Sequence, residues 1–201
     1  SRMPRKPRLE IITPGGLYHI VCRGNNQRRI FRSPRDYKKL LKILRETKKK
    51  YPFHLYSYNL LSNHYHFAIE TINVPISKIM HQINNVYVKY FRKRYGGSGH
   101  LFQDRFYSSL IDKNAYFWEM ACYIDLNAVR AGLVKIPEDY KWSSYSVYCQ
   151  REYNDTLIDR DKFLGYMGED LEIARFAYLK FIDERLKLKK KSSFSVGPKM
   201  V

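Results

Sequence analysis

The stretch FHLYSYNLLSNHYHFAIET, residues 53–71, decides how the chain folds. Aromatic and aliphatic side chains that favour strands fill it on both sides of the turn-forming pair Ser62–Asn63. Two strands joined so closely, residues 53–62 and 64–71, must run antiparallel. The stretch therefore predicts a β-hairpin within an antiparallel sheet.

Helical spacing appears on both sides of this hairpin. Residues 33–50 begin with Ser33 as an N-cap and Pro34 in the first turn, and their leucines recur at helical spacing. Residues 76–94 show a similar pattern and end before a glycine-rich segment. One further strand is predicted before the first helix, over residues 15–24, and another after the second helix, over residues 101–111.

The resulting order is strand, helix, strand, strand, helix, strand, which is typical of a ferredoxin-like (RRM-like) split βαβ fold in the α+β class. We expect a four-stranded antiparallel sheet with the two helices on one face and the other face open. A basic arm (residues 1–8) precedes this core (9–135). A helical elaboration packed on the core (136–187) and a basic disordered tail (188–201) follow it.

The charge balance points to a polyanionic partner. The chain has 37 Lys and Arg against 19 Asp and Glu, a formal net charge of +18, together with 18 tyrosines. Phosphates attract the cations and unstacked bases stack on the rings, so single-stranded nucleic acid fits better than a merely solvated charged surface. Three scattered cysteines and the lack of a long apolar run favour a reducing, cytoplasmic location and no membrane partner.

The predicted second strand of the hairpin carries His64 and His66. Residues two apart in a strand point to the same face, so the two imidazoles stand side by side and can hold one divalent cation. A pair of half-buried histidines bonded to their neighbours fits the same pattern, and the motif alone does not separate the two interpretations.

A predicted helix over residues 114–133 bears on that choice. Its apolar stripe must face the sheet, and a polar row runs along the flank of the stripe. In this row Tyr123 offers a hydroxyl nucleophile and Asn127, one turn later, an oxygen ligand. The row consists of Glu119, Tyr123, Asn127 and Arg130. An ordinary amphipathic tyrosine remains the alternative for Tyr123.

Five blocks in order resemble the REP-associated tyrosine transposases, a branch of the HUH single-tyrosine transposases of bacterial insertion sequences. The resemblance extends from about residue 4 to about residue 185. The blocks are GGLYHIVCRGNN, SNHYHFAIE, GHLFQDRFYSSLI, YIDLNAVRAGLV and PEDYKWSSY.

The resemblance implies a HUH nuclease domain over residues 9–135 that cuts single-stranded DNA beside hairpins in the bacterial cytoplasm, associated with the nucleoid. It assigns Mg²⁺ or Mn²⁺ binding to His64, His66 and Asn127, and attack on the DNA to Tyr123. The product would be a 5′-phosphotyrosine that a 3′-hydroxyl can attack again, so strands are cut and rejoined. The resemblance leaves open whether the chain acts as a monomer or as a homodimer.

Two positions depart from the family pattern, and other residues receive smaller roles. Asp125 stands where His is usual and Ala128 where Pro is usual, and Asp125 would bring a second oxygen ligand or a like charge near the phosphate. His19 is expected to be an ordinary sheet histidine, and Glu119 is a weak candidate for a base. The candidate DNA contacts are Arg23, Asn25, Asn26, Arg28, Arg29, His100, Gln103, Arg105 and Arg130.

Two other functions remain compatible with the sequence. A non-catalytic protein could use an RRM-like sheet to bind hairpin DNA or RNA. A metal hydrolase could cut with water and leave no covalent adduct.

Overall fold

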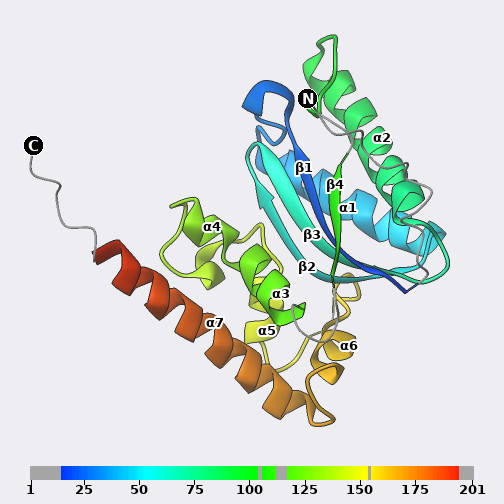
Figure 1. The fold of residues 1–201 in the computed structure, drawn as a ribbon. Helices are drawn as coiled ribbons and strands as arrows, with labels where there is room; N and C mark the ends of the chain where they lie inside the picture. Colours follow the sequence, from blue (N-terminus) through cyan, green and yellow to red (C-terminus); the bar gives the residue numbers. More distant parts are fainter. Residues whose placement is uncertain (1–14, 104–105, 112–116, 154, 195–201) are drawn as a thin grey trace, which may run out of the picture.

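The computed structural model describes residues 15–103, 106–111, 117–153 and 155–194. Its centre is a four-stranded antiparallel sheet in the order β2-β3-β1-β4 (Figure 1). This order, with β1 between β3 and β4, confirms the ferredoxin-like fold. The strands are β1 (Leu17–Arg23), β2 (Phe53–Leu61), β3 (His64–Thr71) and β4 (Tyr107–Ile111).

Helices α1 (Pro34–Lys50) and α2 (Ile76–Tyr95) pack together on one face of this sheet (Figure 1). Alternate residues of the central strands, such as Ile20 and Phe67, are fully buried beneath them. Asp36 fixes the start of α1, because its carboxylate accepts hydrogen bonds from the backbone N–H groups just before the helix. The predicted two helices on one face are therefore confirmed.

The opposite face carries α3 (Phe117–Asp125), which packs against β2 and β3. The side chain of Asn59 in β2 reaches this helix and donates from Nδ2 to the carbonyl oxygen of Ile124 at 2.9 Å. The expectation that this face stays open is therefore wrong over β2 and β3. Its cause is the apolar stripe of the helix, which gains stability only when it is buried.

The helix expected over residues 114–133 is divided in two. Leu126, at φ −85° and ψ 0°, separates α3 from the short α4 (Asn127–Arg130). Hydrogen bonds still cross the break, from the N–H of Leu126 to the carbonyl of Cys122 and from the N–H of Arg130 to that of Leu126. Tyr123 and Asn127 therefore keep nearly helical spacing. Residues 112–116, which include the expected start of this helix at residue 114, lie outside the described residues.

The C-terminal part covers the outer side of α3 and the neighbouring part of β2. It consists of a 3-10 turn (Pro137–Asp139) and three helices, α5 (Tyr145–Cys149), α6 (Arg160–Gly165) and α7 (Leu171–Phe194). Tyr148, Phe163 and Tyr178 hold these helices together through edge-on ring contacts at 5.0–5.1 Å between centroids. Because α7 continues to Phe194, the tail expected to be disordered from residue 188 begins as a helix.

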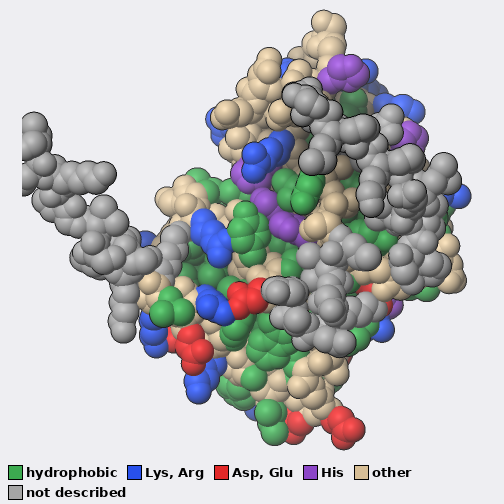
Figure 2. Space-filling model, in the orientation of Figure 1, with side chains coloured by type: hydrophobic (Ala, Val, Ile, Leu, Met, Phe, Trp, Pro, Cys, Tyr) green, Lys and Arg blue, Asp and Glu red, His purple; other side chains and the backbone are tan. Residues whose placement is uncertain are grey.

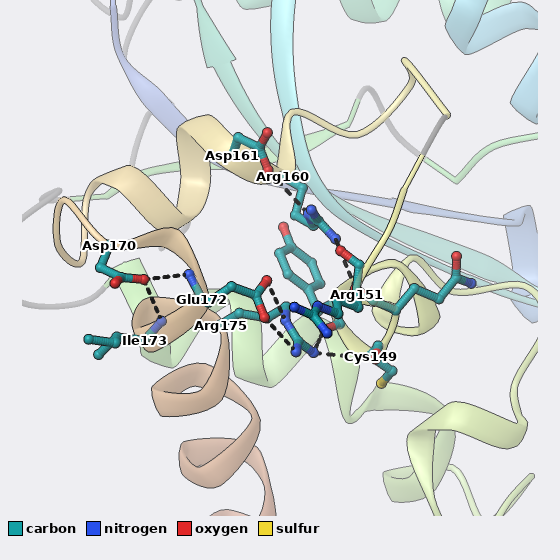
Figure 3. A network of polar contacts seen from close by, with 10 residues as sticks. Cys149, Arg151, Arg160, Asp161, Asp170, Glu172, Ile173 and Arg175 are labelled. Carbon is teal, nitrogen blue, oxygen red and sulfur yellow. Dashed lines mark hydrogen bonds and ion pairs between the residues drawn. The ribbon is translucent and has the colours of Figure 1, made fainter.

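A polar network anchors the start of α7 to α5 (Figure 3). Arg175 is buried, and its guanidinium pairs with Glu172 at 3.0 Å while donating to the carbonyl oxygens of Tyr148 and Cys149 at 3.4 Å. Arg160 donates in the same region to the carbonyl of Gln150 at 2.9 Å. The hydrogen bonds of Arg175 therefore link the start of α7 to the end of α5. Among the described residues, no helix is both long and apolar enough to span a bilayer.

Candidate active site

The pairing of β1 with β3 brings three histidines onto the face that α3 covers. Arg23 lies opposite His64, Val21 opposite His66 and His19 opposite Ala68, so all these side chains project to the same side. The ring centroid of His66 is 5.1 Å from that of His64 and 5.3 Å from that of His19. Histidine side chains gather near the middle of this face in Figure 2.

Tyr123 of α3 stands over these rings. Its ring centroid is 5.9 Å from that of His66 and 5.6 Å from that of His19, in edge-on geometry. The neighbouring Ile124 is fully buried against the sheet, which fixes the rotation of the helix, whereas Tyr123 is 40% exposed. The helix therefore holds the phenol beside the histidines while leaving it open to a substrate.

A cavity of about 430 Å³ opens between the tyrosine and the strands. Tyr107 of β4, which is exposed, and Gln103 form part of its wall. The lining residues are His19, Val21, Arg23, His66, Gln103, Tyr107 and Tyr123. His66 and Tyr123 thus share one solvent-accessible space, and His64 and Asn127 lie outside its lining.

Two residues of α4 complete the surroundings of the tyrosine. The guanidinium of Arg130 lies 4.3 Å from the centroid of the Tyr123 ring, a cation–π contact. Asn127 is buried, and its Nδ2 donates to the carbonyl oxygen of Tyr123 at 3.2 Å. Because the amide nitrogen is used in this way, the amide oxygen of Asn127 is the atom that could serve as a ligand.

Hydrogen bonds orient both histidines of the pair. The Nδ1–H of His64 donates to Oδ1 of Asn63 at 2.6 Å, which places the lone pair of this ring on Nε2. Nδ1 of His66 lies 3.0 Å from Nε2 of His19. Nε2 of His66 is buried and has no hydrogen-bond partner within the described part of the chain. A buried ring nitrogen that no protein group engages is available to a metal ion.

The electrostatics keep these rings neutral. Burial lowers the pKa of His66 to about 2 and the pKa of His64 to about 4, and the nearby positive charge of Arg23 contributes to both shifts. Burial also lowers the pKa of His19 to about 4. Neutral imidazole is the form that binds metals, so the pair is ready to coordinate at neutral pH.

The donor set fits a divalent cation held partly by the substrate. Among the described residues, no group of three or more His, Cys, Asp and Glu is arranged to hold a metal ion. His64 and His66 would supply two imidazoles and Asn127 an amide oxygen, which would leave coordination positions for phosphate oxygens. Mg²⁺ and Mn²⁺ accept such oxygen-rich sets.

Comparison with known proteins places the chain in a family. The model of the family described as "Transposase IS200 like" matches residues 14–127, a segment that includes the histidine pair, Tyr123 and Asn127. This match covers more than half of the chain. The chain belongs to the IS200-like transposase family. No curated protein matches its sequence.

A solved structure has the same fold as this IS200-like transposase. It is described as the REP-associated tyrosine transposase bound to a REP hairpin, and it matches with a TM-score of 0.60. The two chains are 20% identical, and the match covers 79% of this chain and 94% of the other. The likeness therefore extends past the segment that the family model matches and into the C-terminal helices.

Asp125 of the transposase points away from the histidines, contrary to the expectation that it would bring an oxygen or a charge near the phosphate. It is fully buried, where Ser57 Oγ donates to one carboxylate oxygen and Tyr178 Oη to the other at 2.6 Å. Burial raises its pKa to about 7. Asp125 therefore ties α3 to β2 and α7 and takes no part in the cavity.

Glu119 also has a structural partner. Its carboxylate forms an ion pair with Arg185 of α7, and both side chains are partly exposed. This contact lies on the side of α3 that faces the C-terminal helix. The pairing argues against Glu119 as the base for Tyr123, a role for which the sequence made it only a weak candidate.

The segments that carry most of the predicted DNA contacts meet at the rim of the cavity. The N–H of Asn25 donates to the carbonyl of Leu101 at 2.9 Å, and the N–H of Gln103 donates to that of Arg23 at 2.9 Å. Gly24 permits this joint, because a Cβ there would lie 2.1 Å from the carbonyl oxygen of Arg28. Among the predicted contacts, Asn25 and Arg28 are partly buried, Arg105 lies outside the described residues, and the exposed ones are Arg23, Asn26, Arg29, His100, Gln103 and Arg130.

Sequence reasoning missed two polar residues of the cavity. His19 was expected to be an ordinary sheet histidine, yet it contacts both His66 and Tyr123. Tyr107 was not considered, although it pairs with Val21 in the sheet and lines the same space. Both residues could have been found from His66 if the pairing of β1 with β3 and β4 had been known, because side chains on one face alternate along each strand. The sequence of a single strand does not reveal that pairing.

Proposed function

We propose that this transposase is a metal-dependent endonuclease and transesterase of single-stranded DNA. The observation that carries the proposal is the position of Tyr123, whose exposed ring stands over His66 while Nε2 of that histidine is buried and unpartnered among the described residues. A hydroxyl nucleophile next to ligand-ready imidazoles is a constellation for phosphoryl transfer.

Different residues of the chain would bind the metal ion and attract the DNA phosphate. Where Mg²⁺ or Mn²⁺ binds, His64, His66 and the amide oxygen of Asn127 would hold it, and it would supply positive charge to a phosphate oxygen. Arg23 and Arg130 add fixed positive charge beside the cavity and over the tyrosine ring. These charges attract the phosphodiester and oppose the build-up of negative charge during attack.

The chemical step is an exchange of esters. The Tyr123 oxygen attacks phosphorus and loses its proton to solvent, while the bond to the 3′-oxygen of the preceding nucleotide breaks and that oxygen takes up a proton. The products are a 5′-phosphotyrosine and a free 3′-hydroxyl. Because a phenol, which ordinarily ionises with a pKa of about 10, is a better leaving group than an alkyl alcohol, another 3′-hydroxyl can reverse the step.

We further propose that the substrate is DNA with hairpin structure. The formal charge of +18 supplies the phosphate attraction. The solved structure of the same fold is described as bound to a REP hairpin, which supports such a partner here. Since α3 packs on the strands that carry its own chain's histidines, one chain carries the whole constellation, and a monomer suffices for cleavage.

The test uses labelled single-stranded hairpins with unpaired flanks, incubated with the full chain and Mn²⁺ and resolved on denaturing gels. We expect a covalent protein–DNA band that disappears in Tyr123→Phe, His64→Ala and His66→Ala. Tyr107→Phe is the matched control, because Tyr107 is an exposed tyrosine of the same cavity and should keep the band.

The other outcomes separate the competing functions. Cleavage without an adduct that survives Tyr123→Phe would indicate water as the nucleophile and a metal hydrolase. Hairpin binding without cleavage in any divalent metal would indicate a non-catalytic DNA- or RNA-binding protein. Loss of the band in Tyr107→Phe with retention in Tyr123→Phe would move the nucleophile to β4.

A further inference from the structure

We infer that His19 is a positioning residue that holds the ring of His66 in the orientation and tautomer that bind the cation. This inference rests on the proposed function, because it concerns how the same metal site is prepared. It gives a role to a histidine that lies outside the histidine pair and outside the tyrosine helix.

The sheet register brings the two rings together. His19 lies opposite Ala68, so His66 is its diagonal neighbour on the same face. Nε2 of His19 is 3.0 Å from Nδ1 of His66, and the two rings are nearly parallel, with an angle of 24° between their planes. The contact joins residues 47 positions apart in the sequence and therefore depends on the folded sheet.

A hydrogen bond between two neutral imidazoles can run in either direction, and only one direction suits a ligand. If His19 donates, the proton of His66 sits on Nε2, which is buried without an acceptor among the described residues. If His66 donates from Nδ1, the buried and unpartnered Nε2 carries a lone pair that can bind a cation. A cation selects the second arrangement, and His19 is the acceptor that makes it available.

The other histidine of the pair has an equivalent partner. Nδ1 of His64 donates to Oδ1 of Asn63, so its ring is also held through Nδ1 and leaves Nε2 free. Asn63 precedes its histidine directly in the chain, whereas the partner of His66 comes from another strand. Each imidazole thus has an acceptor behind it, which fixes the ring and increases its basicity toward a metal.

His19 acts through His66 and is not itself expected to be a ligand. Its Nε2 is engaged with His66, and the described part of the chain holds no cluster of three or more ligating groups that would include it. Its ring contacts both the proposed ligand His66 and, edge-on, the proposed nucleophile Tyr123. Loss of the His19 acceptor should therefore affect metal affinity before it affects DNA binding.

The experiment measures Mn²⁺ binding to the full chain by calorimetry and by the nitrogen couplings in pulsed electron paramagnetic resonance. We expect His19→Leu to weaken Mn²⁺ binding by about 10- to 100-fold, the usual effect of losing such a partner, and to lose one imidazole coupling. His19→Gln places an amide oxygen near the position of Nε2, so it should restore affinity to within a few-fold of the wild type. Thermal melting of both variants controls for folding.

Two results would overturn the inference in distinguishable ways. If His19→Leu binds Mn²⁺ as tightly as the wild type and keeps both imidazole couplings, His19 has no positioning role and the proposed metal site stands. If the wild type shows no imidazole coupling, or His66→Ala binds Mn²⁺ unchanged, the proposed metal site itself is wrong and the role of His19 falls with it.

Discussion

The two faces of the sheet are built from the same strands but serve different purposes. Tyr65 and Phe67 of β3 project toward α1 and α2 and are fully buried, whereas His64 and His66 between and beside them project toward α3. The first face is closed by rings, and the second keeps a cavity lined by polar groups. Successive residues of one strand therefore point to opposite faces, one packing in the core and the other lining the cavity.

The two buried aspartates show the same contrast. Asp36, at the start of α1, is buried, which opposes ionisation. Hydrogen bonds from Tyr90, Tyr95 and two backbone N–H groups outweigh this effect, and its pKa is lowered. Asp125, on the side of α3, receives only hydroxyl donors, and burial raises its pKa to about 7. The number and kind of donors decide which buried carboxyl stays charged.

The largest effect should come from removing the hydroxyl of Tyr123. Tyr123→Phe is expected to lower strand cleavage by at least about 10³-fold, because the attacking oxygen is gone. The free energy of unfolding should stay within about 0.5 kcal/mol of the wild type, because the side chain is 40% exposed. Single-turnover cleavage assays and urea unfolding measure the two quantities.

The same substitution on the other face is the matched control. The hydroxyl of Tyr65 donates to Oδ1 of Asn84 in the buried contact between β3 and α2. Tyr65→Phe should therefore cost about 1–3 kcal/mol of unfolding free energy and leave cleavage close to that of the wild type below its unfolding transition. A stable but inactive Tyr65→Phe would mean that the two faces are not separate in function.

Creating a cavity in the face that α1 and α2 cover should have the next largest effect, on the free energy of unfolding. Phe67 is fully buried and stacks on Tyr65 with 4.5 Å between ring centroids. Phe67→Ala is expected to lower the free energy of unfolding by about 3–5 kcal/mol, measured by chemical denaturation. The Mn²⁺ affinity of the fraction that remains folded should change little. A loss below about 1 kcal/mol would show that this face is loosely packed.

Local periodicity accounts for the part of this architecture that the sequence predicts. His64 and His66 are two positions apart, and Tyr123 lies on a helix with a clear apolar stripe, so strand and helix periods place them on the right faces. The hairpin and the helices before and after it follow from the same signals. The strand order was obtained from the sequence of elements, since few arrangements connect them without crossings.

Contacts distant in sequence account for what was missed. The bond between His19 and His66 spans 47 residues, and that between Asp125 and Tyr178 spans 53. Neither partner could be assigned before the register of β1 and the path of α7 were known. Which strands α3 covers has the same origin, because its apolar stripe predicts contact with the sheet but its packing on β2 and β3 joins segments that are distant in the chain.

The contrast between the aspartates predicts a pH effect on stability. The folded-state pKa of Asp125 is about 7 and its ordinary value is 3.8, so the folded chain keeps a proton that the unfolded chain loses. The stability from this group is fully present below about pH 3.8 and is lost as the pH rises through 7. Asp125→Asn lacks this dependence, so the wild type should lose stability relative to Asp125→Asn between about pH 4 and pH 7.

The size of that relative loss should be on the order of a few kcal/mol, since one pKa unit corresponds to about 1.4 kcal/mol. Urea unfolding of both proteins at several pH values measures it, and other titrating groups cancel in the difference. Parallel stability curves would mean that Asp125 is ionised in the folded chain. In that case the hydroxyl groups that donate to Asp125 would stabilise its charged form enough to outweigh burial, as the donors to Asp36 do.

The smallest effect should come from the exposed link between α3 and α7. Arg185 pairs with Glu119, and the side chains are 41% and 47% exposed, so solvent screens the attraction. Arg185→Ala is expected to cost less than about 1 kcal/mol and to leave cleavage within a few-fold of the wild type, measured in the same two assays. Buried contacts, among them Tyr178 with Asp125 and the edge-on packing of Trp118 on Phe181, would then be what holds the tyrosine helix. A large loss of cleavage with unchanged stability would instead show that the surface ion pair sets the position of Tyr123.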